Sequence, residues 1–452
     1  MYRWNRIVLA CLMALVARNA FAQDVGAKLA EYMDAAARVD RFQGSVLVAK
    51  EGRPLLSRGY GLADAEHGVG NAPFTKFRLG SITKQFTATA ILMLQDQGKL
   101  SVEDLIARHL DDTPESWKDV TIHHLLTHTS GIPSYTDDPE YGKRMTHPET
   151  VVSMIARFRD KPLDFKPGSK FHYDNSGYFL LGAIIEKVSG RTYEQFLRES
   201  IFQPLGMSDT GYDRTERVLE HRARGYERQG SGIRNASYLD MNQPYAAGSL
   251  YSTTLDMLKW DRALREGRLL KADSMKAMFQ PALENYAYGW LVGEIKGHRQ
   301  VGHGGGINGF MTEFLRFPDD DVCVVVLCNV MPSKPGQVAR DLAAIVFGEA
   351  VESPRERVVA KVDPEVYDAY AGRYEIAPGL VLSVRREGDR LLGQATGQGE
   401  AELFPESETK FFLKVVDAQV TFMKEEGKVT HLVLKQGGRE TQAKRLADEA
   451  KK

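Results

Sequence analysis

A short polar turn near residue 80 leads into a stretch with apolar residues on one helical face. Ile82, Phe86 and Ala90 recur at intervals of four, which predicts a helix with one buried side, ended by Gln97-Gly98. Ser81 stands at the entrance of this helix. Lys84 follows one turn later, so the two side chains are neighbours on the same face.

Apolar runs of strand length occur on both sides of this helix, and a second helix lies between them. The second helix is expected over Phe179–Val188 and is stopped by Gly190. Glu51-Gly52 supplies the turn of a β-hairpin near the N-terminus. The expected strands are Ser45–Ala49, Pro54–Gly61, Tyr288–Val292, Met311–Phe317 and Val322–Cys328.

The pattern changes after a charged stretch over 351–364 that lacks periodicity and is interpreted as a linker. Short strands then follow one another with glycine-containing turns, which is typical of a small antiparallel barrel or sandwich. They are expected at Leu380–Val384, Arg390–Leu392, Lys410–Val415, Val420–Met423 and Val429–Leu434. The predicted organisation is 1–22, a leader; 23–350, the main domain; 351–364, the linker; and 365–447, the β domain.

The leader has the features of a secretory signal peptide. Arg3 and Arg6 precede an apolar run over Ile7–Val16, and Ala20-Phe21-Ala22 supplies the small-x-small cleavage pattern. The run is too short to span a bilayer comfortably, so an uncleaved anchor is the weaker alternative. We therefore expect a bacterial periplasmic or secreted protein without a stable membrane span after cleavage.

Composition narrows the function classes. The chain has 452 residues, 43% of them hydrophobic and 26% charged, and a formal net charge of −1. This balance suits a large globular core and gives no electrostatic case for nucleic-acid binding. Cys323 and Cys328 are five positions apart on one expected strand, so they should point to opposite faces and form no disulfide.

The pair Ser81 and Lys84 suggests nucleophilic catalysis. A serine hydroxyl is a poor nucleophile until a base takes its proton. A lysine amine can be that base if burial and the positive end of the helix dipole lower its pKa towards neutrality. The alternative is an N-capping serine followed by a solvated lysine, and the short motif alone does not separate the two.

A second candidate segment, Phe171–Tyr178, precedes the second helix. The phenol of Tyr173 could relay a proton if a nearby cation lowered its pKa. The carboxamide of Asn175 could hold both a lysine and a substrate amide through its two ends. An Asx turn with a packing tyrosine explains the same residues without function.

The third candidate is a glycine strip, with His303 followed by Gly304, Gly305 and Gly306. Glycines allow a ligand to approach the backbone and expose N–H donors. A phosphate loop is the rival interpretation, but its G-K-[ST] signature is absent. A turn without function remains the plain alternative.

Two other catalytic signatures, a serine elbow and a zinc-binding histidine pair, are incomplete in the sequence. No serine is flanked as G-x-S-x-G, so an α/β-hydrolase elbow is not supported. His124 and His128 have the i,i+4 spacing of a zinc pair, but Leu125 stands where a zincin carries glutamate. We therefore predict no metal site and interpret these histidines as packing or hydrogen-bonding groups.

Taken in order, Ser81-Ile82-Thr83-Lys84, Tyr173-Asp174-Asn175 and His303-Gly304-Gly305 resemble the three motifs of penicillin-recognising serine hydrolases. That group includes class C β-lactamases, DD-peptidases, D-aminopeptidases and related esterases. The resemblance extends over about Asp24 to Gly348 and includes the His124–Pro133 and Ala247–Ser252 segments. The tail from Tyr367, with Tyr370–Tyr374, resembles the lipocalin-like domain appended to many such hydrolases.

The resemblance implies an α+β fold: an antiparallel sheet with packed helices and an all-helical lobe, plus a small all-β barrel. It implies no cofactor. Ser81 would be the acylated nucleophile, Lys84 its base, and Tyr173 a partner in proton transfer to the leaving group. Asn175 and His303 would bind substrate, as would the strip Gly304–Gly306. The backbone N–H groups of Ser81 and Gly306 would form the oxyanion hole.

The implied substrate is a small molecule or peptide with an amide, ester or β-lactam carbonyl, such as a peptidoglycan-type peptide. His303 stands where β-lactamases usually have lysine, and a partly charged imidazole is a weaker anchor for a β-lactam carboxylate. This favours D-amino-acid peptidase-like or esterase activity. Asp174 stands where serine is usual and could raise the pKa of Tyr173 or recognise a substrate amine. A true class C-type β-lactamase or carboxylesterase, and a non-catalytic penicillin-binding or wall-sensing protein, are the alternatives.

Overall fold

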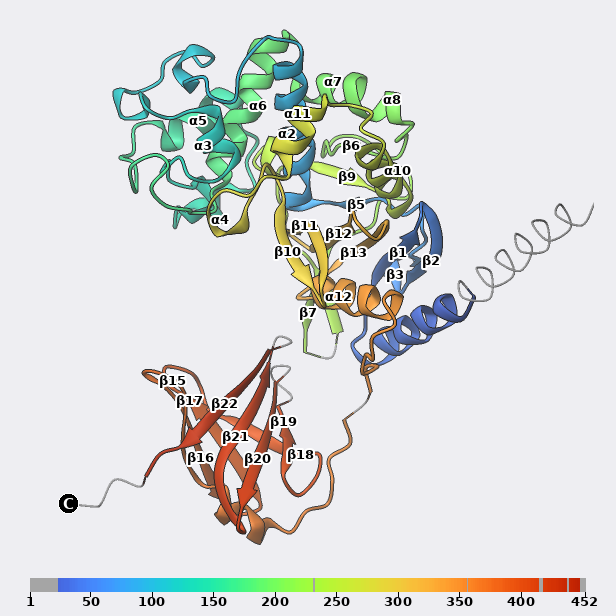
Figure 1. Ribbon diagram of the computed structural model, residues 1–452, viewed down its shortest axis with the longest axis vertical. Coiled ribbons are helices and arrows are strands. Elements are labelled where there is room, and N and C mark those ends of the chain that lie inside the picture. Colours follow the sequence, from blue (N-terminus) through green and yellow to red (C-terminus); the bar gives the residue numbers. More distant parts are fainter. Residues whose placement is uncertain (1–22, 231, 356, 414–417, 437–438, 448–452) are drawn as a thin grey trace, which may run out of the picture. The chain divides into compact units, whose positions relative to one another are not determined.

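A six-stranded antiparallel sheet forms the centre of the first of two units, Met1–Pro354 and Arg355–Lys452 (Figure 1). The computed structural model describes residues 23–447 apart from 231, 356, 414–417 and 437–438. The predicted signal peptide, 1–22, lies outside the described residues. The strand order in the sheet is β10-β11-β12-β13-β1-β2.

The sheet joins the beginning of the domain to its end. Strand β1 lies between β2 and β13, with Val46 opposite Val326. Every residue of β13 is buried, because helices cover both faces of the sheet; this explains its continuous apolar run. The strands are β1 (Gly44–Lys50), β2 (Arg53–Tyr60), β10 (Leu291–Ile295), β11 (His298–Ile307), β12 (Phe310–Phe317) and β13 (Val322–Cys328).

Each face of the sheet has its own hydrophobic cluster. A helix over residues 23–39 and α12 (Pro335–Val346) pack on one face, joined by a hydrogen bond from the Tyr32 hydroxyl to Asp341 (2.7 Å). The helices α2 (Thr83–Asp96) and α10 (Thr254–Arg265) pack on the other. Cys323 belongs to the second cluster and Cys328 to the first, and both thiols are free, as predicted.

The helical lobe packs around α6 (Asn175–Ser189), which lies against α2 (Figure 1). The prediction placed its start at Phe179, four residues too late. The side chain of Asp174 caps the helix by accepting a hydrogen bond from the Gly177 N–H, so the first turn forms before the apolar pattern begins. The other helices are α3 (Ile122–Leu126), α4 (Tyr141–Arg144), α5 (Val151–Arg159), α7 (Tyr193–Leu197), α8 (Gln203–Leu205), α9 (Tyr245–Gly248) and α11 (Ala272–Met278).

The glycine strip is part of a strand rather than a loop. Gly304 and Gly305 lie within β11 and pair with Glu313 and Thr312 of β12. Three smaller sheets complete the first unit: β5 (Phe77–Arg78) with β9 (Leu250–Ser252) and β6 (Gly211–Tyr212), β14 (Val330–Met331) with β7 (Tyr226–Gln229) and β8 (Gly232–Asn235), and β3 (Leu62–Asp64) with β4 (Val69–Gly70).

The second unit is a closed antiparallel barrel in which β15 to β22 follow one another in chain order. Its core is aromatic: the Tyr370 and Phe422 rings stack with centroids 4.4 Å apart, and Phe411 meets both edge-on. The strands are β15 (Gly372–Ala377), β16 (Leu380–Glu387), β17 (Arg390–Ala395), β18 (Ala401–Pro405), β19 (Lys410–Phe412), β20 (Ala418–Glu425), β21 (Lys428–Gln436) and β22 (Arg439–Arg445).

The predicted fold class is therefore confirmed: an α+β domain with antiparallel sheets and helices, and an all-β barrel at the C-terminus. Sequence patterns missed β15, β18 and β22. Charged residues interrupt the apolar alternation of β15 and β22, and β18 is a short strand that ends in a proline.

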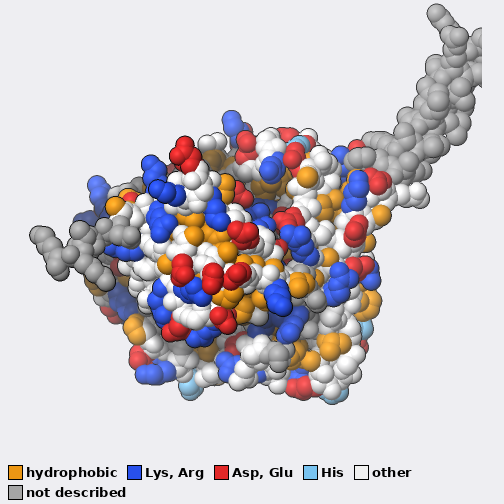
Figure 2. Space-filling model, turned by 90° about the horizontal axis from the view of Figure 1, so that it is seen from below, with side chains coloured by type: hydrophobic (Ala, Val, Ile, Leu, Met, Phe, Trp, Pro, Cys, Tyr) orange, Lys and Arg blue, Asp and Glu red, His pale blue; other side chains and the backbone are white. Residues whose placement is uncertain are grey.

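Surface charge is mixed. On the face drawn in Figure 2, Lys and Arg side chains are interspersed with Asp and Glu rather than separated by sign. Such a face lacks the basic field that attracts a polyanion. Within the described ranges, no helix has the length and apolar character needed to cross a membrane.

Candidate active site

The turn that carries Ser81 is fixed from both sides. It is a 3₁₀ helix, Gly80–Ile82, which runs directly into α2. The Leu79 N–H donates to the Leu250 carbonyl (2.8 Å), and the Thr312 hydroxyl donates to the Leu79 carbonyl (2.7 Å). Strand β9 and strand β12 thus both hold the residues that lead to the nucleophile.

The Lys84 amine is fully buried and has three polar neighbours. Its Nζ donates to Asn175 Oδ1 (2.8 Å) and to the Ala247 carbonyl (3.0 Å), and lies 3.1 Å from Ser81 Oγ. A neutral amine has two N–H groups and one lone pair. The two carbonyl oxygens can take both N–H groups, which leaves the lone pair facing the serine hydroxyl.

Burial is the main cause of the altered electrostatics of this amine. Desolvation lowers the pKa of Lys84 to about 7, and the nearby Asp174 opposes that shift. A substantial fraction of the amine is therefore neutral near pH 7. This is the state that can remove a proton from Ser81.

Tyr173 lies beside this pair. Lys84 Nζ is 4.8 Å from the centre of the Tyr173 ring. The phenol oxygen is buried without a well-formed hydrogen bond to any described residue. Burial raises the pKa of Tyr173, and the nearby Ser81 side chain opposes part of that rise. A neutral, unpartnered O–H next to the nucleophile is free to exchange a proton with a bound substrate.

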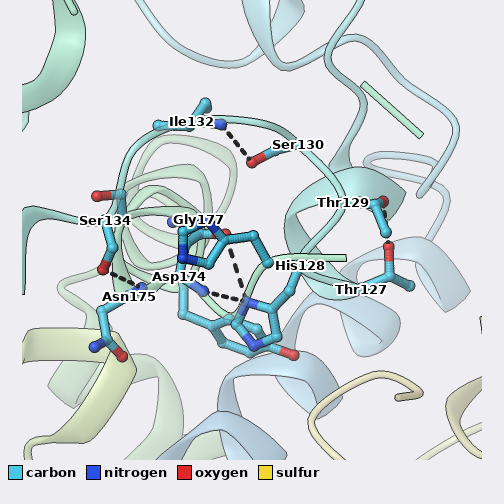
Figure 3. A network of polar contacts seen from close by, with 12 residues as sticks. Thr127, His128, Thr129, Ser130, Ile132, Ser134, Asp174, Asn175 and Gly177 are labelled. Carbon is cyan, nitrogen blue, oxygen red and sulfur yellow. Dashed lines mark hydrogen bonds and ion pairs between the residues drawn. The ribbon is translucent and has the colours of Figure 1, made fainter. Parts of the chain in front are cut away.

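Asn175 is fixed by the segment that follows α3. Its N–H donates to Ser134 Oγ (3.1 Å; Figure 3). Its side-chain amide donates to Thr136 Oγ1 (3.1 Å), and its carbonyl oxygen accepts from Lys84 Nζ. The side chain therefore has one defined orientation, because its oxygen faces a donor and its nitrogen faces an acceptor.

His303 lies on β11 with its ring buried and neutral. Burial, and secondarily the charge of Lys84, lower its pKa to about 3. Its Nε2 contacts the Tyr286 hydroxyl (3.0 Å) and its Nδ1 contacts the Gly304 carbonyl (2.6 Å). The resemblance also implies that His303 orients Tyr173; the two ring centroids are 6.1 Å apart, and the described hydrogen bonds of His303 go to Tyr286 and Gly304.

The glycines of β11 allow this strand to lie against the Ser81 turn. A Cβ on Gly305 would be 2.0 Å from the Leu79 carbonyl oxygen. A Cβ on Gly80, whose φ is +56°, would be 2.9 Å from the Gly306 nitrogen. Gly306 therefore brings a backbone N–H next to the nucleophile turn, where it could meet an oxyanion.

A second buried group lies behind Tyr173. Asp174 and His128 are both buried, and His128 Nδ1 is 3.5 Å from Asp174 Oδ2 (Figure 3). Burial raises the pKa of Asp174 to about 7 and lowers the pKa of His128 well below its usual value. The pair is thus mostly uncharged in acid and can gain a negative charge near neutral pH.

The structure brings all the predicted site residues into one region and adds groups that the motifs did not identify. Ala247, Tyr286, Thr136 and Ser134 contact them directly. Of these, Ala247 lies within a stretch that already resembled the family, and Ser134 directly follows another. Tyr286 gave no signal, because it precedes β10 in an irregular stretch.

A possible metal group lies elsewhere. Among the described residues, Asp64, Glu66 and His67 bring possible ligand atoms within 4.8 Å of one another. They occupy the exposed β3–β4 turn, where His67 already contacts Asp64 (2.9 Å) and Glu66 pairs with Arg224. They touch none of the residues described above.

Comparison with known families gives two matches. The family model "Beta-lactamase" matches residues 27–347, and "Domain of unknown function (DUF3471)" matches residues 356–448. The curated protein "Penicillin-binding protein 4*" of Bacillus subtilis (strain 168) is 32% identical over 437 residues, covering 90% of this chain and 95% of that protein.

Solved structures show the same similarity. The octameric penicillin-binding protein homologue from Pyrococcus abyssi has a TM-score of 0.67 and 27% identity, covering 92% of this chain and 99% of that one. The D-amino acid amidase from Ochrobactrum anthropi SV3 has a TM-score of 0.62 and 26% identity, covering 72% and 98%.

Proposed function

Because the chain belongs to the beta-lactamase family of serine hydrolases, we propose that it hydrolyses an amide, peptide or ester carbonyl through an acyl-enzyme on Ser81. Lys84 takes the proton of the Ser81 hydroxyl as that oxygen attacks the carbonyl carbon. The N–H groups of Ser81 and Gly306 stabilise the oxyanion, and Tyr173 passes a proton to the leaving group while the proton taken by Lys84 returns to Tyr173. Water then attacks the acyl-enzyme carbonyl, which releases the acid and restores the Ser81 hydroxyl.

The observation that carries this proposal is the environment of Lys84. Its three polar neighbours match the two N–H groups and the one lone pair of a neutral amine, and burial lowers its pKa to about 7. A solvated lysine after an N-capping serine would show neither feature. The amine is poised as a base because the protein holds it without a carboxylate partner among its hydrogen bonds.

Two features favour a D-amino-acid amide, peptide or ester over a β-lactam. A neutral His303 offers no positive charge to the carboxylate that β-lactams carry. The D-amino acid amidase and the D-stereospecific amidohydrolase from Streptomyces sp. share the fold at 26% identity. We propose a peptidoglycan-type peptide as the substrate class.

A substrate panel with a covalent probe tests the proposal. The full chain and a Ser81→Ala variant would be incubated with a fluorophosphonate and with a fluorescent penicillin. They would also be assayed on D- and L-aminoacyl p-nitroanilides, a p-nitrophenyl ester and nitrocefin. We expect labelling of Ser81 alone and turnover of the D-aminoacyl or ester substrate above nitrocefin. Unlabelled wild-type protein that turns over none of these substrates would favour a non-catalytic binding protein.

We also propose export to the bacterial periplasm or the medium, supported by the basic, apolar and small-x-small pattern of residues 1–22. Expression of the full chain followed by N-terminal sequencing of the exported form should give Gln23 as the first residue. Retention of the intact N-terminus in the cytoplasmic fraction would contradict export.

A further inference from the structure

His128 is buried beside Tyr173 and lies outside the three motifs that carry the predicted site residues. Its backbone φ is +57°, a left-handed conformation that few non-glycine residues adopt. The side chain is 0% exposed. Backbone strain of this kind costs free energy and often occurs at functional sites. The contacts of His128 therefore show what its conformation holds in place.

His128 is hydrogen-bonded to both sequence neighbours of Tyr173. The His128 carbonyl accepts the N–H of His172 (2.9 Å), the residue before Tyr173. The His128 Nδ1 accepts the N–H of Asp174 (3.2 Å), the residue after it (Figure 3). Between these two hydrogen bonds the imidazole packs on the phenol ring, with centroids 4.3 Å apart.

We propose that His128 is the positioning residue of the Tyr173 phenol: one residue fixes both flanking peptide groups and supports the ring between them. This inference rests on the proposed function, because it assumes that the phenol gives a proton to the leaving group. His128 does not touch the reacting atoms. It acts through Tyr173 by holding the hydroxyl beside Ser81.

The tautomer of His128 follows from the same contacts. Since Nδ1 accepts the Asp174 N–H, the ring proton sits on Nε2, which has no hydrogen-bond partner among the described residues. The imidazole lies among the rings of Phe171, Tyr178 and Tyr286, whose centroids are 4.6 to 6.0 Å from its own. Burial, together with the nearby Lys84, lowers the pKa of His128 and keeps Nδ1 available as an acceptor.

Three substitutions distinguish the hydrogen-bond acceptor role of His128 from the packing role of its ring. In His128→Asn the amide oxygen takes roughly the place of Nδ1, and asparagine tolerates the left-handed backbone. In His128→Gln the oxygen lies one bond further out, where Nε2 was. In His128→Leu no acceptor remains. We expect Asn to preserve most of the wild-type behaviour and Gln and Leu to lose it.

The readout is the dependence of kcat/KM on the leaving group. Phenyl esters with one acyl group and increasingly basic leaving phenols, beginning with p-nitrophenol, would be compared. A weakly basic phenolate leaves without a proton, whereas a basic one needs the acid. General acids contribute about 10²–10⁴-fold, so a misplaced phenol should cost the basic phenols about 10-fold more than p-nitrophenol. A purely structural defect would lower all esters by the same factor.

Two controls keep the result interpretable if Gln or Leu folds poorly. In a Tyr173→Phe background, His128→Asn and His128→Gln should no longer differ in leaving-group dependence, because the residue through which they act is gone. His109→Leu removes another buried imidazole, bonded to Asp104 (2.9 Å), and should leave that dependence unchanged.

The outcomes distinguish this inference from the proposed function. If wild-type protein labels on Ser81 and cleaves esters, but the Asn and Gln variants show the wild-type slope, His128 does not position the phenol. If Tyr173→Phe itself leaves the slope unchanged, the inference also fails. If wild-type protein neither labels nor turns over any ester, the proposed function has failed first.

Discussion

The interior around Ser81 and the interior of the C-terminal barrel are built from opposite kinds of side chain. The first buries an amine, a carboxyl group and two imidazoles within one helical and strand framework. In the described part of the barrel, Gln419 is the polar side chain that is buried, and aromatic rings fill the centre.

This contrast shows where each unit gains and loses stability. Burying an ionisable group costs free energy unless it is neutralised or paired, and the pKa shifts of Lys84 and Asp174 record that cost. Among the described residues, the barrel core holds no amine, carboxyl or imidazole side chain, and ion pairs such as Arg385 with Glu400 lie at the surface. Substitutions in the two interiors should therefore affect different properties.

The largest effect is expected for Lys84→Met. The substitution keeps the volume of the side chain but removes the base, so kcat/KM should fall by about 10⁴-fold or more. The free energy of unfolding should change little, because removal of the desolvated amine is offset by the loss of its hydrogen bonds to Asn175 Oδ1 and the Ala247 carbonyl. Stopped-flow acylation and thermal unfolding would be measured together. A variant that loses activity only because it unfolds would contradict the assignment of Lys84 as base.

The matching change in the barrel is Phe422→Ala. Removing this ring leaves a cavity beside Tyr370 and Phe411, and we expect a loss of about 3–5 kcal/mol in the barrel's free energy of unfolding. All four tryptophans, Trp4, Trp117, Trp260 and Trp290, lie before residue 355, so their fluorescence reports the first unit.

Far-UV circular dichroism of the Phe422→Ala chain should therefore show an early β-sheet transition that the tryptophan signal does not follow. A shift of both signals by the same amount would show that the two units unfold together, and the comparison drawn above would not hold for stability.

A smaller effect is expected where β11 meets the nucleophile turn. In Gly305→Ala the new methyl would overlap the Leu79 carbonyl oxygen and Thr312 Oγ1, so the strand must move away. A displacement of about 1 Å in a catalytic site can cost about 10²-fold in rate. Gly399→Ala in the barrel is the control, since nothing lies within 4 Å of its Cβ position. Equal kcat/KM values for the two variants would show that the close approach is not needed.

The sequence predicted the fold class and the residues that meet at Ser81, because three motifs and their order are local properties of the chain. It did not predict that the glycine strip would form an inner strand, since a glycine run has no side-chain alternation to reveal a sheet. The predicted start of α6 was also too late. The helix begins at the capping hydrogen bond of Asp174, before the first residues of its apolar pattern.

His128 illustrates what the sequence could not supply. Its i,i+4 spacing from His124 is that of a zinc-binding pair. Only Leu125, at the position where a zincin carries glutamate, favours a packing role for the histidines. Its contacts with the residues on either side of Tyr173 bring together positions more than forty residues apart in the sequence. Such pairing depends on how the segment after α3 packs on the head of α6, and no local pattern encodes it.

The smallest expected effect concerns the pH profile. The carboxylate of Asp174 raises the pKa of Lys84, in opposition to burial. Asp174→Asn keeps the helix cap but removes this charge. The acidic limb of the kcat/KM profile should therefore move to lower pH, and activity near pH 6 should be a larger fraction of its maximum. The measurement is kcat/KM from pH 4.5 to 9 for wild type and variant. Both proteins keep the neighbouring histidines His128 and His172, so the carboxyl group is the one titratable side chain that differs between them.

The same variant makes a signed prediction for stability. The pKa of Asp174 is about 7 in the folded protein and about 3.9 in an unfolded chain. Between these values the folded protein holds a proton that the unfolded chain releases, so the stability contributed by this group falls as pH rises through about 7. Asp174→Asn lacks that loss. Its free energy of unfolding, relative to wild type, should therefore rise from pH 4 to 8, whereas a flat difference would show that the buried carboxyl is already ionised in acid.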